Sequence, residues 1–185
     1  NENLASFQMA KTIIEDLKPS DEELKTILDG YYGYNSNYPE GLYVADSTGQ
    51  LITASESTKK ESDVTNSTWY KEGLTRVNMA VGSAYQNADG VNVISASGIL
   101  NDGSDKVRVI SADMTLDRIA IIVNSFIEMN DAEAFLVDKT SGVILANRDS
   151  SLISQTLGAE GQSHFYQLTA EKAAEKDYNF AKIGR

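Results

Sequence analysis

Hydrophobic residues near the start of the chain recur at intervals of three and four positions. Between residues 2 and 18 they are Leu4, Phe7, Ala10, Ile13, Ile14 and Leu17. This spacing places apolar side chains on one face of an amphipathic helix. Pro19 ends the helix, and Ser20 followed by Glu23 is the spacing of a capping box. A second helix should therefore begin there, and we expect a helical segment over residues 1–40.

After residue 41 the hydrophobic period changes to two, which is typical of β-strands. Residues 42–45 and 51–54 flank a polar connection that contains glycine, which predicts a β-hairpin. A short helix carrying Trp69 should follow. Three further strands are then expected at about residues 82–87, 91–98 and 106–114, and a helix at about 116–129 closes the unit.

A similar pattern then restarts. Residues 135–138 and 143–146, joined by a Lys-Thr-Ser-Gly turn, echo the first hairpin. Two units of one design are implied, at 41–130 and 131–185, although two unrelated hairpins would also explain the similarity. The second unit is smaller and incomplete, with a helix at about 162–175 and the beginning of a strand at 178–181. The expected fold class is α+β, a long N-terminal helix packed on two tandem antiparallel-sheet units.

Composition removes several classes of protein. Among 185 residues, 16 are basic and 27 acidic, so the net charge of -11 repels phosphate backbones and nucleic acid is not an expected partner. Cysteine is absent, which excludes disulfides and thiolate chemistry. No apolar run is long enough to span a bilayer. Because the chain starts at Asn1 inside a helix and stops just after a strand begins, we expect an excerpt of a longer protein.

Catalytic and metal-binding patterns are weak. His164 is the only histidine, and no acidic residue is spaced to complete a triad with it. The sequence has no phosphate-binding glycine loop, no HExxH and no complete calcium loop. We therefore expect no enzyme, no metal and no cofactor. The carboxylates of Asp63 and Asp113 leave a carbohydrate-active enzyme as a less favoured alternative.

One set of residues resembles a known family. It consists of the run Ser67-Thr68-Trp69-Tyr70-Lys71, Tyr85 in the next strand, and Asp113 near the end of the fifth strand. Together with the order of elements, these residues resemble the double Cache sensor family. Its members are extracytoplasmic, PAS-like ligand-binding regions of bacterial chemoreceptors and sensor kinases.

The resemblance implies a membrane-distal ligand-binding unit at 41–130 and a partial membrane-proximal unit at 131–185. In members that bind amino acids, an arginine two residues before the Trp-Tyr pair helps to hold the carboxylate, with a tyrosine upstream. Ser67 and Ser62 occupy these places here. In contrast, Tyr70, Tyr85 and Asp113 match the part of the pattern that surrounds the ligand ammonium.

The residues by themselves indicate the same pocket. Strand alternation puts Ser111 and Asp113 on one face, and Ser95 and Ser97 on the corresponding face of the neighbouring strand. If the opposite face packs on the N-terminal helix, this face lies beneath the helix of Trp69. The predicted ligand-binding residues are Trp69, Tyr70, Tyr85, Ser95, Ser97, Ser111 and Asp113.

Each of these assignments has an alternative. A buried aspartate needs a partner, which a ligand ammonium would supply, but Asp113 could instead cap the following helix. Trp69 could simply be a core residue. Absence of the arginine predicts an amine or another ligand without a free carboxylate. An amino acid stays open, because Lys60, Lys71 or Arg76 could replace the arginine.

The expected function is that of an extracytoplasmic ligand-sensing domain in a transmembrane receptor, such as a methyl-accepting chemotaxis protein. Transmembrane helices outside this excerpt would anchor it to the membrane. Ligand binding would shift a population of conformations, and the N-terminal helix would transmit the shift. The alternative is a ligand-free module for dimerisation or protein interaction, and homodimerisation is left open.

Overall fold

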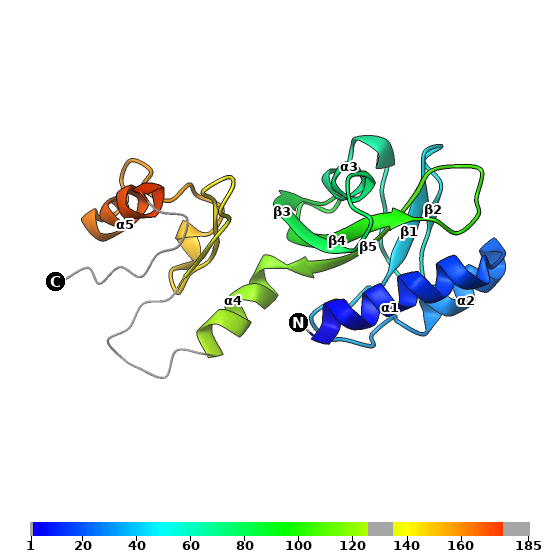
Figure 1. Ribbon diagram of the computed structural model, residues 1–185. Coiled ribbons are helices and arrows are strands. Elements are labelled where there is room, and N and C mark those ends of the chain that lie inside the picture. Colours follow the sequence, from blue (N-terminus) through cyan, green and yellow to red (C-terminus); the bar gives the residue numbers. More distant parts are fainter. Residues whose placement is uncertain (1, 126–134, 176–185) are drawn as a thin grey trace. The chain divides into compact units, whose positions relative to one another are not determined.

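The computed structural model describes residues 2–125 and 135–175 (Figure 1). The chain divides into two compact units, residues 1–118 and 119–185, which we describe separately. Within the described ranges, no helix combines the length and the apolar character needed to cross a membrane.

The first unit begins with two helices, as predicted. Helix α1 spans Glu2–Leu17 and α2 spans Asp21–Asp29. The capping box is present: the Ser20 hydroxyl accepts from the backbone N–H of Glu23, and the Glu23 carboxylate accepts from the backbone N–H of Ser20. These reciprocal bonds satisfy two backbone donors that the start of a helix leaves unpaired.

A five-stranded antiparallel sheet follows. Its strands are β1 (Tyr43–Asp46), β2 (Leu51–Ile52), β3 (Ala80–Gln86), β4 (Asn92–Leu100) and β5 (Arg108–Thr115), in the spatial order β2-β1-β5-β4-β3. A short 3-10 helix, η1 (Val64–Asn66), and helix α3 (Thr68–Leu74) lie between β2 and β3. The predicted hairpin is confirmed, and the Asp46 carboxylate binds the backbone N–H groups of Thr48 and Gln50 in its turn.

Helices cover both faces of the sheet (Figure 1). On one face, Ile110 and Ala112 of β5 share a hydrophobic cluster with residues of α1 and α2 such as Phe7 and Leu24. On the other face, Val109 packs with Trp69 of α3. The alternation of side chains along β5 therefore sorts them as expected, and the serines and Asp113 lie on the α3 side.

The second unit contains a two-stranded sheet, formed by β6 (Leu136–Val137) and β7 (Ile144–Ala146). Helix α4 (Leu116–Ser125) leads from β5 toward it in the sequence, and η2 (Ser150–Leu152) and α5 (His164–Glu175) follow β7. The expected end of α4 at residue 129, the boundary at 130 and the strand at 178–181 lie outside the described residues. The α+β class with a smaller second sheet is confirmed.

Candidate functional site

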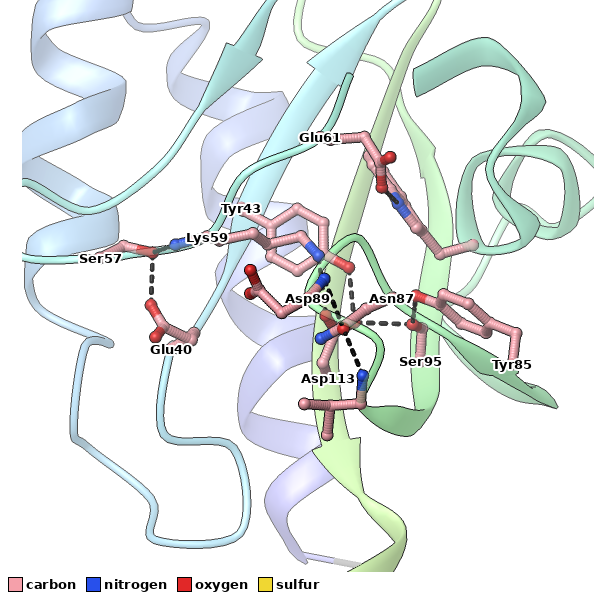
Figure 2. A network of polar contacts seen from close by, with 12 residues as sticks. Glu40, Tyr43, Ser57, Lys59, Glu61, Tyr85, Asn87, Asp89, Ser95 and Asp113 are labelled. Atoms are coloured by element: carbon pink, nitrogen blue, oxygen red, sulfur yellow. Dashed lines mark hydrogen bonds and ion pairs between the residues drawn. The ribbon is translucent and has the colours of Figure 1, made fainter. Parts of the chain in front are cut away.

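Asp113 is the centre of a buried polar network on the α3 side of the sheet (Figure 2). Its position near the end of β5 places it directly opposite Ser95 of β4. The carboxylate oxygen Oδ1 accepts hydrogen bonds from the Tyr43 hydroxyl at 2.5 Å and from the Ser95 hydroxyl at 2.6 Å. The other oxygen, Oδ2, is 2.9 Å from the Lys59 ammonium. All of these partners come from the protein itself.

Tyr85 joins the network through Ser95. Their hydroxyl oxygens are 2.6 Å apart. Because the single Ser95 proton is donated to the carboxylate, which can only accept, the proton between the two hydroxyls must come from Tyr85. The chain of donors thus runs from Tyr85 to Ser95 to Asp113, and it fixes the orientation of all three groups.

The Lys59 ammonium lies in a cage of aromatic rings. It is 4.2 Å from the centroid of the Tyr43 ring and 5.9 Å from that of Trp69, within the range of cation–π attraction. Its side chain is only 6% exposed, and that of Asp113 is 12% exposed. A buried ammonium is stable only with such compensation, which here combines one carboxylate and the faces of aromatic rings.

Trp69 is fully buried and forms one wall of the cage. Its ring meets those of Tyr43 and Tyr70 edge to face, with centroids 4.8 and 5.8 Å apart. The indole Nε1–H donates to the Glu61 carboxylate at 3.2 Å. Trp69 is therefore both a core residue and a neighbour of the Asp113 network.

The loop that carries Lys59 and Glu61 crosses the edge of the site, and we call residues 55–61 the strap. At one end, the Asp29 carboxylate accepts from the backbone N–H and the hydroxyl of Ser55. In the middle, the Glu40 carboxylate accepts from the Ser57 hydroxyl and from the N–H and hydroxyl of Thr58. These bonds hold the strap from outside, while Lys59 reaches inward.

For the remaining predicted residues, the hydrogen bonds described do not involve the Asp113 carboxylate. The Tyr70 hydroxyl donates to the Val107 carbonyl at 2.9 Å, just before β5 begins. Ser97 and Ser111 face each other across β4 and β5, fully buried, and their hydroxyl oxygens have no hydrogen-bond partner among the described residues. The structure thus brings Tyr85, Ser95 and Asp113 together, with Trp69 beside them, and separates them from Tyr70.

Burial and the nearby carboxylate raise the pKa values of two tyrosines of the site, Tyr43 and Tyr85. Burial raises the pKa of Tyr43 well above its ordinary value of 10.0, and the charge of Asp113 raises it further. The pKa of Tyr85 is raised by the same two causes in the same order. Both phenols are therefore neutral donors over the physiological pH range.

These contacts bear on two alternatives from the sequence. Asp113 does not cap α4, since the Thr115 hydroxyl accepts from the backbone N–H of Arg118 instead. The cation that contacts Asp113 is Lys59, whereas the three cations considered as replacements for the arginine have other surroundings. Lys60 and Lys71 are exposed, and Arg76 binds the Glu72 carboxylate and the Ala80 carbonyl.

Sequence reasoning missed Tyr43, Lys59 and Glu61. A signal for Tyr43 existed, because pairing β1 with β5 places it opposite Ser111 and on the same face as Asp113. Lys59 and Glu61 belong to a polar stretch without periodicity, so no pattern in the sequence distinguishes them from the neighbouring charges.

Two hollows of the first unit lie away from Asp113. One, of about 400 Å³, is lined by residues that include Lys18, Asp102 and Arg108. The Arg108 guanidinium is already bound there by Asp102 at 2.8 Å and Asp21 at 2.7 Å. The other, of about 460 Å³, lies at Met9 and Tyr34. Neither contains a predicted ligand-binding residue.

The architecture resembles that of Cache-type, PAS-like domains: an N-terminal helix on one face of a five-stranded antiparallel sheet, followed by a second, smaller sheet. Solved structures with this fold include ligand-binding domains of chemoreceptors and the extracellular domain of a histidine kinase. No protein-family model matches the sequence, and no curated protein matches it either.

Three of these neighbours illustrate the similarity. The ligand-binding domain of the Pseudomonas fluorescens chemoreceptor CtaA, solved with L-valine, has a TM-score of 0.61 and 19% identity over 84% of this chain and 73% of its own. That of Pseudomonas aeruginosa PctB, solved with L-Arg, has a TM-score of 0.63 and 22% identity over 85% and 64%. The extracellular domain of the histidine kinase mmHK1S-Z3 has a TM-score of 0.66 and 16% identity over 94% and 73%. The chain thus spans between 64% and 73% of the length of these neighbours.

Proposed function

We propose that this chain is the extracytoplasmic ligand-sensing domain of a transmembrane signal-transduction receptor, and that its first unit binds a small metabolite through an ammonium group. The observation that carries the proposal is the Asp113 site. A carboxylate oriented by Tyr43 and Ser95, beside the faces of aromatic rings, already holds one ammonium there. The fold shared with chemoreceptor ligand-binding domains supports the sensing role.

The chemistry of the site is sufficient for recognition. A charge-assisted hydrogen bond to Asp113 would contribute about 1.5–3 kcal/mol. Contact of the cation with the Tyr43 and Trp69 rings would add about 0.5–2 kcal/mol. In this proposal Tyr85 and Ser95 keep the carboxylate in position. Tyr70, Ser97 and Ser111 support α3 and the sheet behind it.

The proposed class of ligand is wider than the amines without a free carboxylate that the sequence predicted. Ser62 and Ser67 lack a positive charge, which favours an amine without a carboxylate. The structural neighbours solved with L-valine and L-Arg, however, hold ligands that carry one. We therefore propose an ammonium-bearing metabolite in general, with amines and amino acids as the two groups that the test must separate.

The decisive experiment compares each L-amino acid with its decarboxylated amine by thermal shift and calorimetry. Mass spectrometry of small molecules that purify with the protein would name the natural ligand. Asp113→Asn should abolish the response while the circular dichroism spectrum stays folded, and Asp105→Asn, at an exposed site, should retain it. Stabilisation that survives Asp113→Asn would refute the site.

Signalling would follow from a shift between two arrangements of the first unit. Helix α1 packs on the sheet face opposite Asp113, so a change at β5 reaches the helix through one layer of buried side chains. We propose that the first unit is membrane-distal and the second membrane-proximal. Transmembrane helices beyond this sequence would connect them to an output domain.

A second candidate is a ligand-free module for dimerisation or protein interaction, without enzymatic activity. The observation that favours it is Lys59, which fills the polar site with the protein's own atoms. Such a module would show no thermal response to either group of compounds, and its mass in sedimentation would rise with concentration. Turnover of a bound compound, followed by mass spectrometry, would indicate an enzyme instead.

A further inference from the structure

We infer that the strap is a tethered occupant of the Asp113 site, and that Lys59 must leave before an external ammonium can bind. This inference rests on the proposed function and adds its regulation. The site would be closed by its own chain until a ligand competes successfully for Asp113.

The first support is the placement of the Lys59 ammonium. It lies 2.9 Å from Asp113 and 4.2 Å from the Tyr43 ring centroid, which are the contacts that any ammonium ligand would need. With its side chain 6% exposed, Lys59 leaves little room for a second cation. Two ammonium groups at one carboxylate would also repel each other at close range.

The second support is Glu61, two residues further along the strap. Its carboxylate accepts the indole N–H of Trp69, the second ring near the Lys59 ammonium. The strap therefore binds two polar groups of the site: the Lys59 ammonium binds the Asp113 carboxylate, and the Glu61 carboxylate binds the Trp69 indole N–H. Figure 2 shows Lys59 and Glu61 on the same loop, with the Lys59 side chain reaching toward Asp113.

The third support is the way in which the strap is held. Its anchors are Asp29 and Glu40, and most of these hydrogen bonds are exposed. The strap has no regular structure, and Ser55, Thr58 and Lys60 face solvent. Withdrawal of Lys59 breaks its own buried contacts with Asp113 and the Tyr43 ring, but rotation of this one flexible side chain is enough to do so, and the anchors can stay in place. If the strap backbone moves as well, its anchor at Asp29 would transmit the movement to α2.

Competition from the tethered Lys59 ammonium should measurably weaken the binding of a free ammonium ligand. The attached ammonium competes at an effective concentration in the millimolar range. The apparent affinity of a free ammonium is therefore its intrinsic affinity multiplied by the fraction of sites from which Lys59 is withdrawn. Removal of the Lys59 amine should therefore tighten binding of a simple ammonium by on the order of tenfold or more.

The test is chemical rescue of Lys59→Ala with n-propylammonium, which supplies the atoms that the substitution removes beyond Cβ. In buffer, Lys59→Ala should melt at a lower temperature than the wild type. Millimolar n-propylammonium should raise its melting temperature, and 1-propanol should not. The wild type and Lys60→Ala, which keep Lys59, should respond at least tenfold more weakly.

Two further variants make the result unambiguous. The double variant Lys59→Ala/Asp113→Asn should lose the rescue, because the carboxylate that binds the probe is gone. If Lys59→Ala is unfolded in buffer, n-propylammonium should restore its circular dichroism spectrum and a cooperative melt. Equal responses of the wild type and Lys59→Ala, or a rescue that persists without Asp113, would overturn the inference.

These outcomes are independent of the natural ligand. Rescue of Lys59→Ala by n-propylammonium, combined with no response of the wild type to any amino acid or amine, would establish the tethered occupant and refute ligand sensing. Binding of a metabolite by the wild type as tightly as by Lys59→Ala would support sensing and refute the tethered occupant.

Discussion

At the scale of single residues, the charge balance at Asp113 decides how the site behaves. Lys59 and Asp113 are both largely buried, so each compensates the cost of removing the other from water. Tyr43 and Ser95 complete the carboxylate's hydrogen bonds. Substitutions of these residues should therefore be strongly coupled to one another.

Asp113→Asn should destabilise the first unit by about 3 kcal/mol, because it leaves the Lys59 ammonium buried without a counter-charge. Lys59→Met in the same protein should recover much of this loss, since the pair is then replaced by neutral groups. Urea unfolding followed by the fluorescence of Trp69, the single tryptophan, measures both. Additive effects of the two substitutions would contradict the pairing, and Asp105→Asn is the exposed control.

Tyr43 should make stability depend on alkaline pH. Its pKa is raised well above 10.0 by burial and by Asp113, so the native state keeps a proton that the unfolded state releases. The contribution of Tyr43 to the free energy of unfolding is constant below pH 10. It is lost as the pH rises above 10, with a slope of up to about 1.4 kcal/mol per pH unit.

Tyr43→Phe should therefore lower stability by about 1 kcal/mol at neutral pH, through the lost hydrogen bond, and flatten the alkaline slope. Urea unfolding at a series of pH values gives both quantities. Tyr34→Phe, which removes the phenol of a residue that is 62% exposed, is the control. An alkaline slope equal to that of the wild type would contradict the prediction for Tyr43.

At the scale of elements, the close approach of α3 to the sheet holds the wall of the site in place. Gly73 of α3 faces β4 and β5, and a Cβ there would overlap Val109 and lie 3.3 Å from the Ser97 Cβ. A glycine allows the helix to approach until Trp69 and Tyr70 bury their rings against Tyr43 and Val109. Ser97 therefore lines the contact with the helix.

Gly73→Ala tests this packing. Alanine favours a helix over glycine by about 1 kcal/mol, but the overlap should cost about 1–3 kcal/mol, so we expect a net loss of stability. Thermal unfolding measures the difference, and Lys71→Ala, at an exposed position of the same helix, should be nearly neutral. An increase in melting temperature for Gly73→Ala would show that α3 can move away without cost.

At the scale of the whole molecule, the division of the chain after Arg118 separates the Asp113 site from the second unit. Both hydrophobic clusters around the five-stranded sheet are formed by residues before 118. The second unit has its own contacts, among them the rings of Phe135, Phe165 and Tyr166. Every residue described at the Asp113 site thus belongs to the first unit.

A fragment of residues 1–125, which retains α4, should therefore fold by itself. We expect cooperative unfolding, the Trp69 fluorescence of the full chain and the same response to n-propylammonium in its Lys59→Ala form. Circular dichroism and urea unfolding of both chains provide the comparison. A fragment without a cooperative transition would show that the first unit needs the second.

The sequence by itself determined the elements and the faces of the sheet, because hydrophobic period and turn residues act over short distances. It placed Ser95 and Asp113 on the α3 side, where the structure has them. Only the tertiary structure decided which groups meet there. Lys59 is 54 residues from Asp113 in the chain, in a segment with no periodicity, and its position depends on anchors at Asp29 and Glu40. Since no local preference directs that loop, only the folded chain shows that the carboxylate already has a cation.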